Sequence, residues 1–131
     1  MPKLLLFFSH TLTPEQQQDA EKNWGVVEFV SLPEGLQSAW SNVPPEGKLI
    51  PDYLQQFTDF ISESALLTDY LLIQGEYGLT VSLTEWAIRN GYTALYSTTK
   101  RVYQHRTLAD GSTENVHVIK HIQFRKFELL L

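Results

Sequence analysis

The chain has 131 residues, 43% of them hydrophobic, and carries 15 acidic against 10 basic side chains for a net charge of −5. This length suits one domain, residues 1–131, and the apolar content is too high for a disordered chain. The absence of cysteine excludes disulfides, thiolate metal sites and cysteine nucleophiles. Because no apolar run approaches the roughly 20 residues that span a bilayer, we expect a cytoplasmic, soluble protein with no membrane partner.

The first half of the chain alternates apolar runs with helical patterns. Residues 3–8 are apolar without interruption after Lys3, which is typical of a parallel strand covered on both faces. A helix is predicted next, because Thr13 and Gln16 form a capping box, Pro14 suits the first turn and Gly25 suits the end. A second strand is then predicted over 26–30, a short helix over 36–41 and an amphipathic helix over 51–64.

The second half continues this alternation and then changes. Strands are predicted over 70–74 and 93–96, with a helix over 79–89 between them. Two further predicted strands, 102–108 and 116–127, flank the hairpin signal Asp110-Gly111. The pattern predicts a Rossmann-like α/β domain, with a mostly parallel sheet flanked by helices over residues 1–99 and a C-terminal β-hairpin over 100–131. The hairpin would add strands at a sheet edge or project to a partner.

Charge is unevenly spread along the chain. Residues 1–93 hold four basic and twelve acidic groups, whereas residues 94–131 hold six basic and three acidic groups. The overall negative charge argues against a binder of long nucleic acid. The basic C-terminal third is either a local anion site or a solvated hairpin face, and charge alone leaves both open.

Three polar segments follow predicted strands, and ligands of open α/β sheets bind outside the carboxyl ends of the strands. We therefore expect these segments to form the site. They are Ser9, His10 and Thr11 after the first strand, Gln74, Gly75, Glu76, Tyr77 and Gly78 after the third, and Ser97, Thr98, Thr99, Lys100 and Arg101 in a loop after the fourth.

Each segment has a chemical and a structural interpretation. The glycines at 75 and 78 either let the backbone approach a phosphate or make a tight strand-to-helix turn. The hydroxyls and two cations of 97–101 either bind phosphate or merely precede an exposed hairpin. His10 is either an acid–base group or a packing residue, and no Ser–His–Asp triad is apparent because no carboxylate stands out as its third member.

The remaining histidines and tryptophans are assigned to structure. His117 and His121 would lie about 13 Å apart on a strand, too far to share a zinc ion. They are predicted to form an outward polar strip with Arg125, and no metal site or cofactor is expected. Trp24 and Trp86 are predicted to lie in the core, whereas Trp40 is left open as a pocket or subunit-interface residue.

Taken together, the segments at 3–13, 72–78, 97–101 and 124–126 resemble a small Csx-type family of CRISPR-associated proteins that accompanies type III systems. The segments read KLLLFFSHTLT, LIQGEYG, STTKR and FRK. The resemblance covers essentially the whole chain. It implies a Rossmann-like fold related to CARF sensor domains, and a homodimer whose shared cleft holds a cyclic oligoadenylate, with cyclic tetra-adenylate as the expected ring.

The resemblance also implies ring-nuclease activity, which linearises this second messenger and ends the antiviral response. We assign the catalytic roles to Ser9, His10, Lys100 and Arg101 from the chain's own pattern, because the resemblance itself fixes no catalytic position. The ribose 2′-hydroxyl would attack the adjacent phosphate without metal, a positioning and charge-stabilising task. Two alternatives stay open, a sponge that binds the ring without cutting it and a protein-interaction accessory that docks through the basic hairpin.

Overall fold

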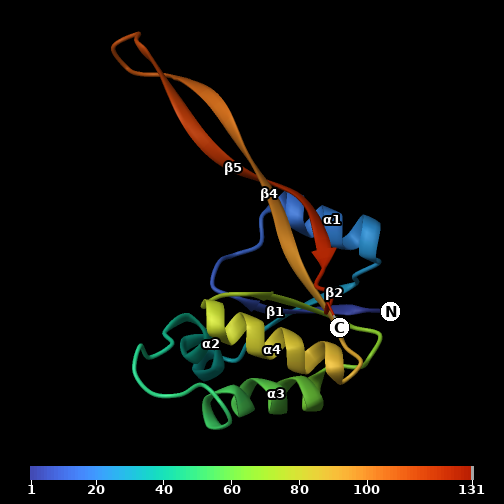
Figure 1. Cartoon of the computed structure of the whole chain (residues 1–131). Coiled ribbons are helices and arrows are strands. Elements are labelled where there is room, and N and C mark those ends of the chain that lie inside the picture. The colour runs from blue at the N-terminus through green and yellow to red at the C-terminus, as the bar shows by residue number, and fades with distance from the viewer. Residues whose placement is uncertain (131) are drawn as a thin grey trace.

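Strands and helices alternate along most of the chain in the computed structural model, which describes residues 1–130. Figure 1 shows α1 on one face of the sheet, α2, α3 and α4 on the other, and a long hairpin that extends past both layers. The elements are β1 (Lys3–Phe8), α1 (Pro14–Trp24), β2 (Glu28–Ser31), α2 (Glu34–Ser41), α3 (Asp52–Ser64), β3 (Tyr70–Gln74), α4 (Tyr77–Arg89), β4 (Thr93–Thr107) and β5 (Thr113–Lys126). The predicted α/β class, mostly parallel sheet and C-terminal hairpin are confirmed.

The sheet has the order β2-β1-β3-β4-β5, with the first four strands parallel and β5 antiparallel to β4. Leu5 of β1 therefore has Val30 of β2 on one side and Leu71 of β3 on the other. The chain leaves β1 in one direction to reach β2 and later returns to β3 on the opposite side. This reversal makes the carboxyl ends of β1 and β3 a topological switch point, where open α/β sheets bind ligands.

Both faces of the sheet are buried, which explains the uninterrupted apolar run of β1. On the face covered by α2, α3 and α4, Phe7 meets Trp40 and Phe57 edge-on, with ring centroids 5.6 and 6.4 Å apart. On the face covered by α1, Leu4 packs with a second cluster that includes Leu95. Side chains of β1 alternate between the two cores, so neither face of the strand can be polar.

Local sequence signals set several boundaries as predicted. Thr13 and Gln16 form the capping box of α1, and Gly25 ends that helix with a φ of 69°. The Asp110-Gly111 turn joins β4 to β5, with Gly111 at a φ of 86°. The fourth helix begins two residues before the predicted start, because the Glu76 carboxylate caps its first turn.

The structure corrects the prediction for 97–101 and decides the place of Trp40. The predicted loop at 97–101 is part of β4, which runs without a break from the sheet core into the hairpin. A register shift at Thr98 and Thr99 bends the strand there instead of ending it. Trp40, which was left open as a pocket or interface residue, is 1% exposed and lies inside the core.

The hairpin beyond residue 99 leaves the body of the protein as a two-stranded arm (Figure 1). On one face of the arm Val102 lies opposite Val118, and both are half-buried. The other face exposes Tyr103 at 71% and Ile119 at 66%. An isolated two-stranded hairpin is marginally stable in water, so this arm is a poor candidate for an unpartnered element.

Candidate functional site

A cavity of about 480 Å³ opens at the carboxyl ends of β1 and β2. Three residues of the predicted site, Ser9, His10 and Thr11, line it because they follow β1 directly. The other lining residues come from β1, α1, β2 and α2, namely Leu6, Phe8, Leu12, Gln17, Phe29, Ser31, Gln37 and Ser41. The wall therefore combines hydroxyl, amide and imidazole groups with an apolar floor, as ligand pockets commonly do.

A short hydrogen-bond chain holds this wall in place. The Gln37 side-chain amide donates to the Phe8 carbonyl at 3.0 Å and to Ser41 Oγ at 3.1 Å. Ser41 Oγ is in turn 2.9 Å from Ser9 Oγ. The His10 ring meets the edge of Phe8 with centroids 5.4 Å apart and remains exposed. Ser9 is thus fixed from α2, while His10 keeps its ring nitrogens accessible to a ligand.

The polar groups that follow β3 are used largely within the protein. The Gln74 carbonyl accepts a hydrogen bond from Trp40 Nε1 at 3.2 Å, and Gln74 Oε1 accepts one from the Ser97 amide at 2.9 Å. Glu76 Oε1 accepts from the Leu79 amide at 2.7 Å as the cap of α4. Tyr77 is 90% exposed. Gln74 and Ser97, predicted as members of one site, are therefore brought together by a direct bond.

The two glycines of this segment are explained by packing. A Cβ on Gly75 would lie 2.8 Å from three atoms of the Trp40 indole, and one on Gly78 would lie 3.0 Å from Leu49. Neither glycine has a positive φ. A smaller second cavity, about 280 Å³, borders Gly75, Tyr77 and Tyr96 on the α4 side. Close approach of protein side chains is sufficient reason for both glycines.

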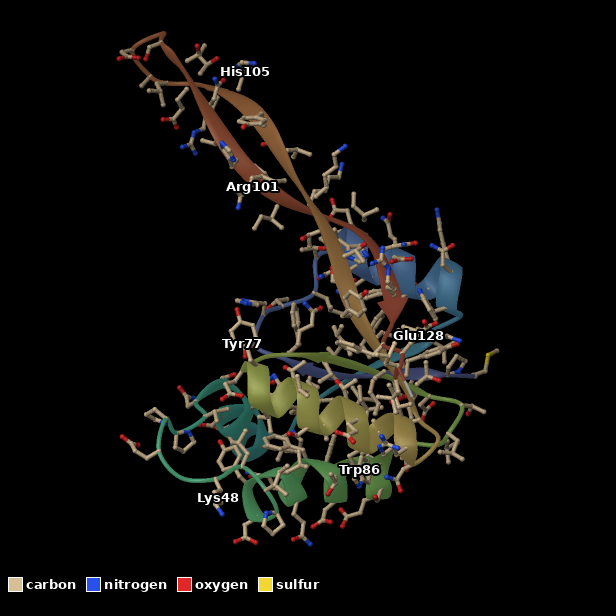
Figure 2. All side chains as sticks on the ribbon, viewed as in Figure 1. Lys48, Tyr77, Trp86, Arg101, His105 and Glu128 are labelled. Atoms are coloured by element: carbon tan, nitrogen blue, oxygen red, sulfur yellow. The ribbon has the colours of Figure 1, made fainter. Side chains whose placement is uncertain are left out.

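The residues predicted as a phosphate loop instead follow the extended course of β4. Thr98 Oγ1 donates to the Gln123 carbonyl at 2.9 Å, while Thr99, Lys100 and Arg101 are exposed. Figure 2 shows Arg101 on the projecting hairpin, well away from Tyr77 at the edge of the sheet. Neither cation is among the residues that line the cavity at β1.

Lys100 nevertheless has a notable neighbour. It lies directly opposite Lys120 in the antiparallel register of β4 and β5. Like charges facing each other across two strands destabilise a sheet unless an anion or a partner compensates them. This pair makes the hairpin base a local anion-attracting site.

A further polar cluster lies between α1 and the hairpin base. Ser97 Oγ is 2.5 Å from His121 Nδ1, and His121 Nε2 is 2.8 Å from Asp19 Oδ2. The His121 and Asp19 side chains are 4% and 8% exposed. The predicted outward strip of His117, His121 and Arg125 is therefore wrong for His121, because the bend of the strands turns its ring under α1.

Asp19 is the residue that the sequence interpretation missed. Burial raises its pKa, but hydrogen bonds from Asn23, His121 and the Phe124 amide together outweigh burial and lower the pKa below the ordinary 3.8. The Phe124 amide donates to Asp19 Oδ2 at 2.7 Å. Helical spacing could have predicted that Asp19 is buried. Asp19 lies three residues after the buried capping residue Gln16, on the same face of the helix, and next to buried Ala20.

Residues 1–130 lack two kinds of feature. No described group of three or more histidine or acidic side chains could hold a metal ion. None of the described helices is long and apolar enough to cross a bilayer.

Comparisons with known proteins place the chain in a family. The family model described as "Uncharacterized protein MJ1673 family" matches residues 2–125. The chain belongs to the MJ1673 family. It is 42% identical over 127 residues to "Uncharacterized protein MJ1673" of Methanocaldococcus jannaschii, an alignment that covers 97% of this chain and 98% of that protein. No solved structure matches this MJ1673-family chain.

Proposed function

We propose that this MJ1673-family protein is a ring nuclease that binds a cyclic oligoadenylate, with cyclic tetra-adenylate as the expected ring, and linearises it to end type III CRISPR signalling in the cytoplasm. The sequence resemblance to Csx-type proteins suggests the ligand. The observation that carries the proposal is the 480 Å³ cavity at the carboxyl ends of β1 and β2, on the β2 side of the switch point, lined by Ser9, His10 and Thr11. Cavities of this size hold small ligands or parts of larger ones.

The proposed reaction needs no metal. The ribose 2′-oxygen attacks the adjacent phosphorus, the bond from phosphorus to the 5′-oxygen breaks, and a 2′,3′-cyclic phosphate and a 5′-hydroxyl result. Ser9, fixed by Ser41, positions the 2′-hydroxyl. The leaving 5′-oxygen must gain a proton, and the exposed His10 imidazole donates it as the general acid. Lys100 and Arg101 stabilise charge on the phosphate.

In a homodimer, Lys100 and Arg101 of one copy would reach the ligand held in the cavity of the other copy. We infer that the hairpin arms of two copies pack together, because each arm exposes Tyr103 and Ile119 on one face. Tyr103 pairs with His117, so Ile119 is its diagonal neighbour on the opposite strand. We infer that a second copy of the chain covers this face. An isologous dimer presents the same groups twice, which suits a ligand that is a ring of repeated units.

Disrupting the exposed face of the arm tests this dimer. The double variant Tyr103→Glu, Ile119→Glu is expected to shift the molar mass from dimer to monomer in multi-angle light scattering, because four carboxylates would then meet in the interface. Leu66→Glu is the matched control, since Leu66 is 68% exposed in the segment between α3 and β3. A monomeric wild-type protein at high concentration would contradict the inference.

Lys100→Ala tests the phosphate assignment. We expect ring affinity to fall roughly tenfold, and the slope of log affinity against log salt to decrease by about 1, because one phosphate contact is lost. Lys48→Ala removes the same charge from an exposed residue between α2 and α3, far from the hairpin in Figure 2, and should change neither quantity. Equal affinities and slopes for both variants and wild type would show that the phosphates bind elsewhere.

Sequestration without cleavage is the second candidate. It is favoured by His10, to which no carboxylate of residues 1–130 hydrogen bonds, so no partner fixes the tautomer that acid–base catalysis requires. Incubation of the protein with cyclic tetra-adenylate, followed by chromatography, separates the candidates. Linear product supports the nuclease, tight binding with a fully recovered ring supports the sponge, and failure to bind any cyclic oligoadenylate leaves the docking accessory.

A further inference from the structure

Ser97, His121 and Asp19 form an unbroken hydrogen-bonded line from a half-buried hydroxyl to a buried carboxylate. We propose that Ser97 is a chemically activated hydroxyl, and that it accepts the proton of the attacking ribose 2′-hydroxyl. The acceptance of the ribose proton rests on the proposed function, whereas the activation of Ser97 rests only on its contacts with His121 and Asp19. Ser97 is then the catalytic residue of the line, and His121 and Asp19 are positioning residues that act through it.

With His121 neutral, the hydrogen-bond inventory gives the line one direction. An ionised carboxylate only accepts, and Asp19 is held in that form because its pKa is lowered. Nε2 of a neutral His121 therefore carries the hydrogen and donates it to Asp19 Oδ2 at 2.8 Å. Nδ1 is left as an acceptor, so Ser97 Oγ donates to it at 2.5 Å. A serine hydroxyl thus faces a base that is itself oriented by a carboxylate, which is the arrangement that activates nucleophilic serines.

The ring is turned over relative to the common triad, in which Nδ1 faces the carboxylate and Nε2 faces the serine. Either nitrogen of an imidazole can take a proton while the other donates, so the reversal leaves the acid–base chemistry intact. Packing holds the reversed ring in place. The His121 and Phe124 rings have centroids 4.7 Å apart, and the Phe124 amide fixes Asp19 Oδ2 at 2.7 Å.

Accessibility and position favour Ser97 as the reacting member. His121 and Asp19 are almost fully buried, whereas Ser97 is partly exposed, so Ser97 is the member of the three that lies nearest to solvent. Its amide donates to Gln74 Oε1, and Gln74 is the last residue of β3. Gln74 also pairs with Phe8, whose successors Ser9 and His10 line the cavity. Ser97 therefore lies two strands from that cavity, at the same edge of the sheet.

The proton moves in a balanced sequence. The 2′-hydroxyl gives its proton to Ser97 Oγ as Ser97 gives its own to His121 Nδ1, and the bond from the 2′-oxygen to phosphorus forms. The bond from phosphorus to the 5′-oxygen breaks, and this oxygen takes a proton from His10 or water. The imidazolium stays paired with the Asp19 carboxylate until it returns its proton through Ser97 to solvent.

A structural anchor between α1 and β5 is the competing explanation. Such an anchor needs Asp19, His121 and the Phe124 amide, but gains little from the hydroxyl of the partly buried Ser97. Ser97→Ala therefore separates the explanations without threatening the fold. Ser82→Ala, at a half-buried serine of α4, is the matched control.

The test is single-turnover cleavage of cyclic tetra-adenylate. We expect Ser97→Ala to cleave 10²- to 10⁴-fold more slowly than wild type and Ser82→Ala to match wild type. A Ser97→Ala rate within twofold of wild type would overturn the proposal. His121→Asn should slow cleavage by a similar factor without weakening ring binding, a split that an anchor would not give. The charged groups that face His121 are Asp19 and Glu15 of α1 and Lys120 of β5.

A second experiment applies if the wild-type protein cleaves no ring. That result would contradict the proposed function but would leave the activation of Ser97 open to test. The folded protein is then treated with a fluorophosphonate. Ser97 Oγ should bond to phosphorus as fluoride leaves and the proton passes to His121 Nδ1. An adduct on Ser97 that is absent from His121→Asn would support the activated hydroxyl. An unlabelled Ser97 in wild type would overturn it.

Discussion

An Asp19→Asn variant is expected to lose about 3 kcal/mol of unfolding free energy at pH 7. Asp19 accepts hydrogen bonds from Asn23, His121 and the Phe124 amide while 8% exposed, and bonds to a charged acceptor are each worth about 1.5–3 kcal/mol. An amide has one acceptor oxygen, so at least one of the three donors loses its acceptor. Urea titration measures the change.

The loss of unfolding free energy in Asp19→Asn should become smaller at low pH. Asp19 has a lowered pKa in the folded protein, so its carboxylate stabilises the fold above the unfolded value of about 3.8 and stops doing so as pH falls through the lower folded value. The difference between wild type and Asp19→Asn should therefore be full at neutral pH and shrink below about pH 4.

A matched variant isolates the buried charge. Asp59→Asn makes the same change at an exposed position of α3 and should alter stability by less than about 0.5 kcal/mol. If Asp19→Asn were as stable as wild type, or if the difference persisted unchanged to pH 2, the carboxylate would not organise the cluster beneath α1.

Replacing Gly75 with alanine is expected to cost about 2 kcal/mol. The new Cβ would lie 2.8 Å from three atoms of the Trp40 indole, which is 1% exposed and held by its hydrogen bond to the Gln74 carbonyl. Overpacking of a well-ordered core costs about 1–3 kcal/mol, since neither ring nor backbone can move freely. Thermal and urea unfolding both report the change.

Gly35→Ala is the control for this substitution. A Cβ on Gly35 would meet nothing within 4 Å, and Gly35 lies in the first turn of α2, so alanine should be neutral or stabilise by up to about 1 kcal/mol. If Gly75→Ala kept full stability but lost ring binding, Gly75 would serve the ligand and not the packing of Trp40.

The architecture could be predicted because its signals are local. The capping box of Thr13 and Gln16, the stop at Gly25 and the turn at Asp110-Gly111 each depend on residues within a few positions of one another. The uninterrupted apolar run of β1 likewise reports burial on both faces. These features fix strand and helix order, and the switch-point rule then locates the β1 end of the candidate site.

The Ser97 cluster could not be predicted because it depends on distant contacts. Asp19 and His121 are 102 positions apart, and the bend of β4 and β5 brings His121 under α1. Alternation along a regular strand placed His121 outward with His117. The same bend turned a predicted loop at 97–101 into continuous strand, since hydroxyl-rich segments carry no local mark that separates a loop from a bulged strand.

The most direct test of the central proposal is single-turnover incubation of excess protein with cyclic tetra-adenylate in EDTA, with products resolved by chromatography and mass spectrometry. The account predicts linear oligoadenylate that ends in a 2′,3′-cyclic phosphate and a 5′-hydroxyl, at a rate that EDTA does not change. Recovery of the intact ring, or cleavage that EDTA abolishes, would contradict it.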